Sequence, residues 1–452
     1  MKAFFKAKSI AVIGASRNPN KVGHVILKNL LESDYQGKVY PVNPNASYLL
    51  NVKCYHAVAA LPHKVELAVI AVPAEQSLQA VEDCGKHHIK NIVMVTAGFA
   101  EVGNHELEQK LLKIVQKYKI NLIGPNVLGV YDAHSSLDTL FLPRLRLNRP
   151  KPGSISFVCQ SGAVGSATLD LIAKQGYGCA KFISYGNALT INETDCIEYL
   201  GQDPETKVIC LYIEGIKQGK RFMKVCKKVS KKKPIVAVKG GMTQAGSQAA
   251  LSHTASLAGS GEIYKAAFKQ SGILWAESLE DWFDYARVLE KSIKPKGEKV
   301  MIITNGGGYG ILAADAVEKN KLKMASFQPR TRTALQKKFP RLVNIHNPLD
   351  LVGDADTQRY ADALEACLED KNIDMILLIV LYQTPLITSD IVDVIKEAYD
   401  QKKKPLFIVS TGGDFTELHK RSLEEHGIPC FTFPERAVQA MKVVVDFYNK
   451  EQ

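Results

Sequence analysis

The sequence predicts an α/β protein made of three doubly wound domains. Short, continuously apolar runs alternate with amphipathic segments along the whole chain, and such runs are typical of parallel strands that are buried on both faces. The length of 452 residues corresponds to about three domains of roughly 150 residues each. Basic, proline-containing connectors lie at residues 147–154 and 292–299, and we interpret them as domain boundaries.

Each predicted domain contains its own series of strands, turns and helices. We expect the domains to span residues 1–147, 148–293 and 294–452. They are alike in architecture, although no sequence period repeats between them. In chain order, the expected strands with their following turns are 9–16, 38–45, 65–74, 91–99 and 121–126, then 154–162, 179–187, 208–215 and 234–241, then 299–310, 375–383 and 405–413.

The formal net charge of +12 is compatible with nucleic acid or with a smaller polyanion as a partner. Lysines cluster at residues 227–234 and 400–405, each time just before an apolar strand, where they are typical of solvated helix ends. Aromatic residues that could stack on bases are not interleaved with them. The pattern therefore favours a solvated surface over a nucleic-acid groove, and it leaves room for a phosphate-rich cofactor or an acidic partner chain.

Several features bear on the cellular location. The first residues, MKAFFKAKSIAVIGAS, have lysines among their apolar positions and run directly into a strand, unlike a secretory signal. No stretch approaches the roughly 20 apolar residues of a membrane-spanning helix. The nine cysteines are scattered, without a CxxC pair or a metal-like spacing. We therefore predict free thiols, a cytoplasmic protein, and no metal site on this chain.

The turn after the first strand, residues 12–23, resembles a nucleotide-binding turn but lacks the GxGxxG spacing. The second strand ends at Asn43 rather than at an acidic residue able to hold the ribose of NAD. A nicotinamide site is therefore disfavoured. Ser16, Asn18 and Lys21 could instead offer a hydroxyl, backbone amides and an ammonium group to another phosphate-bearing ligand. A purely structural tight turn is the alternative.

Two later turns have a sharper pattern, because each places small or amide residues between an apolar strand and the start of a helix. Small residues let an anion approach the unpaired N–H groups at the positive end of the helix dipole. Two such turns, together with the loop that carries His253, indicate that the protein handles a phosphoryl group. The candidate phosphate ligands are Gln160, Ser161 and Gly162 in one turn, and Asn305, Gly306, Gly307 and Gly308 in the other.

His253 lies in a run of small residues and lacks the apolar neighbours that would bury it as a core residue. A lone histidine usually has a structural role, and the other histidines near helix ends or on a polar helix fit that explanation. Glu214, however, ends an apolar strand and supplies a carboxylate that could orient an imidazole and stabilise its charge. We therefore predict a phosphohistidine at His253, on a loop whose small residues let it travel between two sites.

The stretch KGGMTQAGSQAALSHTASLAGSGEIYKAAFKQSGI at 239–273 resembles the phosphohistidine segment of the nucleoside-diphosphate-forming acyl-CoA synthetases. This family includes the ADP-forming acetyl-CoA synthetases and is related to succinyl-CoA synthetase. The resemblance covers essentially the whole chain. Further similar motifs follow in the family's order at residues 11–30, 39–45, 124–132, 156–165, 184–187, 212–216, 303–316 and 347–356.

The resemblance implies a Rossmann-like CoA-binding first domain followed by two flavodoxin-like, succinyl-CoA synthetase-like domains. It also implies the reversible conversion of acyl-CoA, phosphate and ADP into a carboxylate, CoA and ATP, through an acyl phosphate that phosphorylates His253 beside Glu214. Asn126 would sit near the thioester and help to position the acyl group. The residues implied for CoA binding are Gly14, Ser16, Asn18, Lys21, Asn43, Val72, Pro73, Gly98 and Asn126.

One departure from the family pattern concerns the nucleotide. The sequence contains no recognisable ATP-grasp domain and no GxxxxGK[ST] loop, and its last glycine turns belong to the third domain. We therefore expect an α subunit in a hetero-oligomer, whose ATP-grasp β subunit supplies the site for ADP, ATP and Mg²⁺.

Two alternatives come from other classes of protein. The same three domains also occur fused to acetyltransferase modules, so a non-catalytic sensor of CoA or acyl-CoA is possible. The presence of His253, Glu214 and both glycine turns argues against a sensor. An NAD-dependent oxidoreductase is disfavoured by the first turn. Acetate is the family's default acyl group, while propionate, branched-chain and aryl acids stay open.

Overall fold

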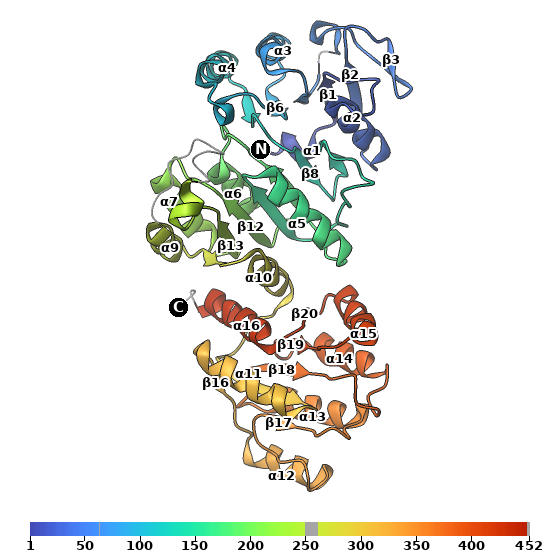
Figure 1. The fold of residues 1–452 in the computed structure, drawn as a ribbon, viewed down its shortest axis with the longest axis vertical. Coiled ribbons are helices and arrows are strands. Elements are labelled where there is room, and N and C mark those ends of the chain that lie inside the picture. The colour runs from blue at the N-terminus through green and yellow to red at the C-terminus, as the bar shows by residue number, and fades with distance from the viewer. Residues whose placement is uncertain (63, 249–260, 450–452) are drawn as a thin grey trace. The chain divides into compact units, whose positions relative to one another are not determined.

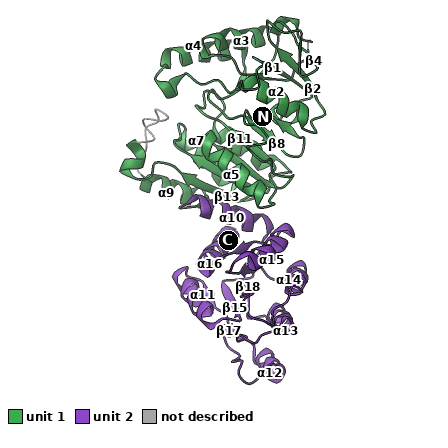
Figure 2. Ribbon diagram, turned by 45° about the vertical axis from the view of Figure 1, so that its right-hand side comes forward, with its two compact units in different colours: residues 1–277 green, residues 278–452 purple. Residues whose placement is uncertain are grey.

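The structure is a computed structural model that describes residues 1–62, 64–248 and 261–449. Parallel sheets flanked by helices (Figure 1) confirm the predicted α/β class. The chain divides into two compact units, residues 1–277 and 278–452, which Figure 2 shows in green and purple. Every strand expected from the sequence contains an observed strand. The strands that were not expected have two or three residues each, too few to leave a readable apolar run.

The first sheet of unit 1 is parallel and has the strand order β2-β1-β5-β6-β7. The chain therefore leaves β1 toward one side of the sheet and later returns to its other side. Such a reversal opens a crevice at the carboxyl ends of the strands, where ligands bind. The strands are β1 (Ser9–Ile13), β2 (Lys38–Val42), β5 (Leu67–Ile70), β6 (Asn91–Met94) and β7 (Asn121–Ile123), with the hairpin β3 (Tyr48–Leu49) and β4 (Val52–Lys53), the α-helices α1 (Ala3–Lys6), α2 (Val22–Glu32), α3 (Ala74–Lys86) and α4 (His105–Tyr118), and the 3₁₀ turns η1 (Val58–Ala60) and η2 (Ala100–Val102).

The second sheet of unit 1 has seven strands in the order β14-β13-β12-β10-β11-β8-β9. The last two strands at one end of this sheet, β8 and β9, pair in antiparallel fashion and come from residues 130–138, ahead of the predicted boundary at 147. The second sheet therefore takes in residues that the sequence assigned to the first domain. The elements are β8 (Val130–Asp132), β9 (Leu137–Asp138), β10 (Ile155–Cys159), β11 (Lys181–Ser184), β12 (Val208–Ile213), β13 (Ile235–Lys239), β14 (Leu274–Trp275), α5 (Gly162–Lys174), α6 (Glu193–Gln202), α7 (Gly219–Val229) and α9 (Gly261–Gln270).

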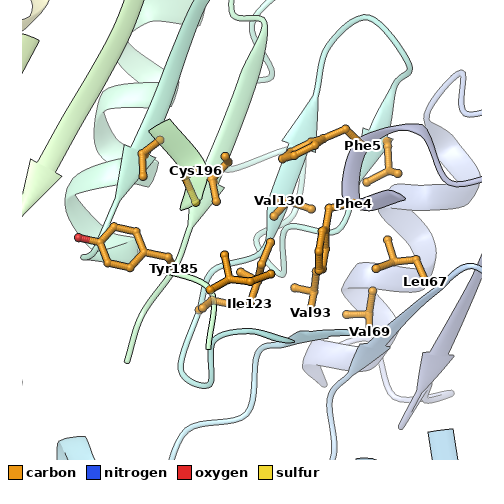
Figure 3. Close-up of a cluster of buried hydrophobic side chains, with 14 of the residues drawn as sticks. Phe4, Phe5, Leu67, Val69, Val93, Ile123, Val130, Tyr185 and Cys196 are labelled. Carbon is orange, nitrogen blue, oxygen red and sulfur yellow. The ribbon is translucent and has the colours of Figure 1, made fainter. Parts of the chain in front are cut away.

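One hydrophobic core connects the two sheets of unit 1 (Figure 3). Phe4 and Phe5 of α1 are fully buried and belong to the same cluster as Leu67 of the first sheet and Val130 of the second. Burying a phenylalanine side chain contributes roughly 1.5–3 kcal/mol. Because these side chains contact residues from both sheets, they explain why two predicted domains form one compact unit.

Unit 2 contains a parallel sheet in the order β16-β15-β18-β19-β20, with β17 paired to β15. Its central strands β18 and β19 are buried along their whole length, as the continuous apolar runs predicted, whereas the edge strand β16 is exposed. The elements are β15 (Lys299–Thr304), β16 (Lys323–Met324), β17 (Leu349–Asp350), β18 (Met375–Ile379), β19 (Leu406–Val409), β20 (Cys430–Phe431), α10 (Leu279–Lys291), α11 (Gly307–Lys319), α12 (Pro329–Lys338), α13 (Thr357–Glu369), α14 (Ile391–Asp400), α15 (Asp414–Glu425) and α16 (Pro434–Asn449).

Helix α10 belongs to unit 2 by its contacts, although it precedes the predicted boundary at 293. The buried Arg287 explains this placement. Its guanidinium donates to Asp284 Oδ1 over 3.0 Å, to Glu424 Oε1 over 3.1 Å and to the carbonyl oxygen of Cys430 over 2.9 Å. These charge-assisted bonds fasten α10 to α15 and β20.

All nine cysteines lie in described residues, and all are buried and free, as the scattered spacing predicted. Burial raises the pKa of thiols such as those of Cys84 and Cys159, which keeps them protonated and unreactive. Within the described part of the chain, no helix is both long and apolar enough to cross a membrane.

Candidate active site

A cavity of about 1250 Å³ in unit 1 lies where strand ends from both of its sheets meet. Turns that follow β5, β6 and β7 form one side of it, and turns that follow β10, β11 and β12 form the other. The cavity brings together residues that the sequence predicted for two purposes. Val72, Pro73 and Asn126 come from the predicted CoA site, and Gln160, Ser161, Gly162 and Glu214 come from the predicted phosphoryl-transfer site.

The turn after β1 is shaped by close backbone packing. Gly14 has a φ of +93°, and a Cβ atom added at Gly23 would lie 2.0 Å from the carbonyl oxygen of Gly14. Helix α2 therefore starts directly against this turn, and a side chain at position 23 would push them apart. The cavity lining includes Val22 from α2 but not Gly14, Ser16, Asn18 or Lys21.

Internal hydrogen bonds hold the same turn in place. The Ser16 hydroxyl accepts the N–H of Asn18 over 3.1 Å, and the Asn18 side chain accepts the N–H of Asn20 over 2.9 Å. Asn43 Nδ2 donates to the carbonyl oxygen of Ala15 over 2.7 Å. The polar side chains predicted for CoA binding thus stiffen the turn, while Asn18 and Lys21 stay exposed to solvent.

Asn126 is held in an unusual backbone conformation, with a φ of +61°. Its N–H donates to the carbonyl oxygen of Thr96 over 2.9 Å, and Thr96 Oγ1 donates to the carbonyl oxygen of Val72 over 2.8 Å. A Cβ atom added at Gly186 would lie 2.2 Å from the carbonyl oxygen of Asn126. The two sheets therefore meet backbone to backbone at this point, which only a glycine at position 186 allows.

Gln160 joins two neighbouring strand ends of the second sheet. Its Oε1 accepts the N–H groups of Glu214 over 2.8 Å and Gly215 over 3.1 Å, and the hydroxyl of Tyr185 over 3.2 Å. The sequence predicted Gln160 as a phosphate ligand. In the structure its side-chain oxygen is used to position the turn that carries Glu214.

Helix α5 opens into the cavity at its N-terminus. Ser161 is the N-cap residue, and its hydroxyl accepts the N–H of Val164 over 3.4 Å. The remaining N–H groups of the first turn have no partner within the helix, and the helix dipole favours an anion beside them. Gly162 has no side chain to block such an approach. This end of the cavity therefore has the geometry and the partial positive charge that suit an anion.

Glu214 lines the cavity and is 7% exposed. Lys239, at the end of the adjacent strand β13, is also buried, and its ammonium group lies 4.7 Å from the centre of the Tyr264 ring. Burial lowers the pKa of Lys239, and the charge of Glu214 partly opposes this shift. Burial, followed by the Glu214 charge, raises the pKa of Tyr212 to about 12. The site thus contains a buried carboxylate with a buried ammonium group as its electrostatic neighbour.

The predicted phosphohistidine His253 lies outside the described residues.

In unit 2, the turn before α11 has the amide residue at its start that the sequence predicted. Asn305 Nδ2 donates to the carbonyl oxygen of Leu381 over 3.0 Å and to Thr384 Oγ1 over 2.9 Å, and its Oδ1 accepts the N–H of Leu381 over 2.9 Å. Helix α11 has Gly306 as N-cap without a side-chain cap bond, and a Cβ added at Gly308 would meet nothing within 4 Å.

Sequence reasoning missed several polar residues around the cavity. The cavity lining includes Glu108, Asn187 and Lys217. Glu101 is not part of the lining, but it accepts a hydrogen bond from Asn187. Gly98, a predicted CoA ligand, is absent from the lining, and its N–H donates to Glu101 Oε1 over 2.5 Å. Asn187 ends the SYGN motif, which was the one available signal.

Three protein-family models match consecutive parts of the chain. A CoA binding domain matches residues 8–133, a succinyl-CoA ligase like flavodoxin domain matches residues 152–289, and a ligase-CoA domain matches residues 300–447. The order agrees with the expected Rossmann-like and flavodoxin-like domains.

Curated relatives match along nearly the whole chain. The ADP-forming acetate–CoA ligase II subunit alpha of Pyrococcus furiosus is 40% identical over 451 residues, which cover 98% of this chain and 96% of the relative. The ADP-forming acetate–CoA ligase of Methanocaldococcus jannaschii is 42% identical over 438 residues, which cover 96% of this chain and 61% of the longer relative. Among solved structures, the dinucleotide forming acetyl-coenzyme A synthetase 1 of Ca. Korarchaeum cryptofilum, in complex with phosphate and ADP, has a TM-score of 0.94 at 36% identity and covers 100% of this chain and 97% of that chain.

Proposed function

The chain belongs to the family of ADP-forming acetate–CoA ligases and aligns with their α subunits over nearly the whole of both chains, and on this premise we propose that it catalyses the same class of reaction. Acyl-CoA, phosphate and ADP would be converted reversibly into a carboxylate, CoA and ATP. Acetyl-CoA is the acyl donor that the relatives' names suggest. Because these relatives are ligases, they support an enzyme over a non-catalytic sensor.

The observation that carries the proposal is the shared cavity, which joins the turn at Asn126 to the N-terminus of α5 and to Glu214. Phosphate at the start of α5 would attack the carbonyl carbon of the thioester. A C–O bond forms, the C–S bond breaks, and CoA leaves as a thiolate that takes up a proton. The dipole of α5 stabilises the negative charge that develops on the oxygens.

We place CoA along the first sheet. The exposed turn of Ser16, Asn18 and Lys21 would bind its phosphates, with Gly14 and Asn43 shaping that turn. The pantetheine arm would pass Val72 and Pro73, which line the cavity, and bring the thioester to Asn126. Gly98 acts on this site through the backbone, because its N–H bonds to Glu101.

The acyl phosphate would then transfer its phosphoryl group to a ring nitrogen of His253, which releases the carboxylate. Glu214 would accept a hydrogen bond from the other ring nitrogen and stabilise the imidazolium. Both helix-start turns, Ser161–Gly162 and Gly306–Gly308, would bind phosphoryl oxygens.

A partner chain would complete the reaction. The relatives named as alpha subunits imply a second subunit, and we propose that it is an ATP-grasp β subunit that holds ADP and Mg²⁺. The phosphoryl group of His253 would pass to ADP there. We propose a cytoplasmic location for the assembly.

Incubation of the full chain with acetyl-CoA and radiolabelled phosphate tests this function. We expect acid-labile, base-stable label on the wild-type chain and none on His253→Ala. His426→Ala is the matched control, because His426 is bonded to the exposed Asp400 in unit 2 and should keep the label. An unlabelled wild-type chain that still binds acetyl-CoA in calorimetry would contradict a phosphohistidine route.

A further inference from the structure

Hydrogen bonds of Asn187 join the two sheets of unit 1 beside the cavity. Its Nδ2 donates to Glu101 Oε2 over 2.6 Å and to Glu108 Oε2 over 3.0 Å, and its Oδ1 accepts from Asn126 Nδ2 over 3.4 Å. Asn187 follows β11 of the second sheet, whereas Glu101 and Glu108 lie in η2 and α4 beside the first. We call Glu101, Glu108, Asn126 and Asn187 the Asn187 clasp.

Within the clasp, the Glu101 carboxylate is held in place by hydrogen bonds from the backbone. Its Oε1 accepts the N–H groups of Gly98 over 2.5 Å and Phe99 over 3.2 Å. Burial alone would raise the pKa of Glu101, but hydrogen bonds from Asn187 and the backbone outweigh burial and lower this pKa. Glu101 is therefore ionised at neutral pH, and hydrogen bonds to a charged acceptor are stronger than those between neutral groups.

Glu101 is not part of the cavity lining, whereas Asn126, Asn187 and Glu108 are. Its two oxygens face in different directions, one toward the backbone after β6 and one toward Asn187. The backbone of Asn126 is already held by Thr96. The direction of the Asn126 side chain is therefore set through Asn187, and the direction of Asn187 is set by Glu101, which makes the shorter bond, together with Glu108.

We propose that Glu101 is a positioning residue for the acyl donor, acting through Asn187 on the side-chain amide of Asn126. The inference rests on the proposed function, in which Asn126 meets the thioester. Glu101 does not touch the substrate. It orients the Asn126 amide, which would contact the thioester. The same hydrogen bonds connect the CoA-binding side of the cavity to the side that carries Glu214, because Lys217, close to Glu214 in the cavity lining, donates from Nζ to the carbonyl oxygen of Asn187 over 3.0 Å.

Glu101→Gln tests the inference, because glutamine keeps one oxygen and turns the other position into a donor. A donor at that position would face either the N–H groups of Gly98 and Phe99 or the Nδ2 of Asn187. We expect the affinity of the full chain for acetyl-CoA to fall about tenfold, the loss expected for a hydrogen bond to a charged group. The affinity for free CoA, which has no thioester carbonyl, should fall less than about threefold by the same reasoning.

Calorimetric titration with acetyl-CoA and with CoA provides both values, and Asn126→Ala and the double variant complete a cycle. Asn126→Ala should lower the affinity for acetyl-CoA similarly, and Glu101→Gln should add nothing to it. Glu106→Gln is the matched control, because Glu106 is an exposed carboxylate on α4 bonded to Lys110. Asn187→Ala breaks the clasp from its other end if Glu101→Gln fails to fold.

The outcomes separate this inference from the proposed function. A wild-type chain that binds neither ligand would overturn both. A wild-type chain that binds both, with equal losses for acetyl-CoA and CoA in Glu101→Gln or with additive losses in the double variant, would overturn the positioning role alone.

Discussion

The turns that precede α5 in unit 1 and α11 in unit 2 are held to a neighbouring strand end by similar hydrogen bonds. In each, an amide side chain, Gln160 or Asn305, bonds to backbone groups that follow a neighbouring strand, β12 or β18. In each, glycines start the helix. They differ in their surroundings, because α5 is capped by the Ser161 hydroxyl and opens into a cavity with Glu214, whereas the N-cap of α11 is Gly306.

The comparison distinguishes the structural role of the amide side chain in each turn from the roles of the groups around it. The amide side chains brace the sheet edge, so their place in the motif does not require contact with phosphate. Any binding of an anion would come from the backbone N–H groups of the helix starts. In the proposed function, reactivity would come from a third source, the buried carboxylate of Glu214, whose backbone N–H is bonded by Gln160.

The largest effect should follow from Glu214→Gln, which removes the charge that most distinguishes the α5 turn. Glutamine cannot stabilise an imidazolium, so phosphohistidine formation by the full chain should fall about 100-fold or more. The measurement is the rate of labelling from acetyl-CoA and radiolabelled phosphate. Glu193→Gln is the control, because Glu193 is also a buried carboxylate but lies outside the cavity lining. Equal losses in both variants would show that Glu214 acts only through folding.

A matched pair, Gln160→Ala and Asn305→Ala, tests the shared bracing role. Each change removes three hydrogen bonds and should lower the stability of its own unit by about 1–3 kcal/mol. Hydrogen exchange should locate the damage, with faster exchange at Glu214 and Gly215 in one variant and at Leu381 in the other. Unchanged exchange at these amides would contradict the bracing role.

The sequence was sufficient to predict the main strands and the helix-start turns, because both leave local patterns. It was insufficient for β8, which reaches the second sheet through pairing with Phe182 of β11 and other distant residues. The Asn187 clasp could not be predicted for the same reason, because its hydrogen bonds join residues that are distant in the sequence. Its members are spread from Glu101 to Asn187, and no local spacing indicates that a carboxylate in the connection after β6 bonds to an amide that follows β11.

Gly308→Ala tests whether the α11 turn binds phosphate, as the sequence predicts. The added methyl group has no neighbour within 4 Å, and a Gly→Ala change at a compatible position typically stabilises by about 0.4–1 kcal/mol. We expect stability to hold or rise while phosphohistidine formation falls about tenfold, because the methyl group would stand where the proposed phosphate approaches the helix start. Full activity in a stable variant would limit the phosphate site to α5.

The smallest effect should come from Ser161, whose hydroxyl makes the cap that α11 lacks. Ser161→Ala should cost about 1 kcal/mol of stability, and Ser161→Gly, which gives α5 the same N-cap residue as α11, only a few tenths. Thermal unfolding of both variants measures this difference. If the hydroxyl also binds phosphate, the two variants should lose phosphate affinity equally despite their unequal stability, because neither has a side-chain oxygen at position 161. Affinity losses that instead follow the stability losses would confine Ser161 to capping α5.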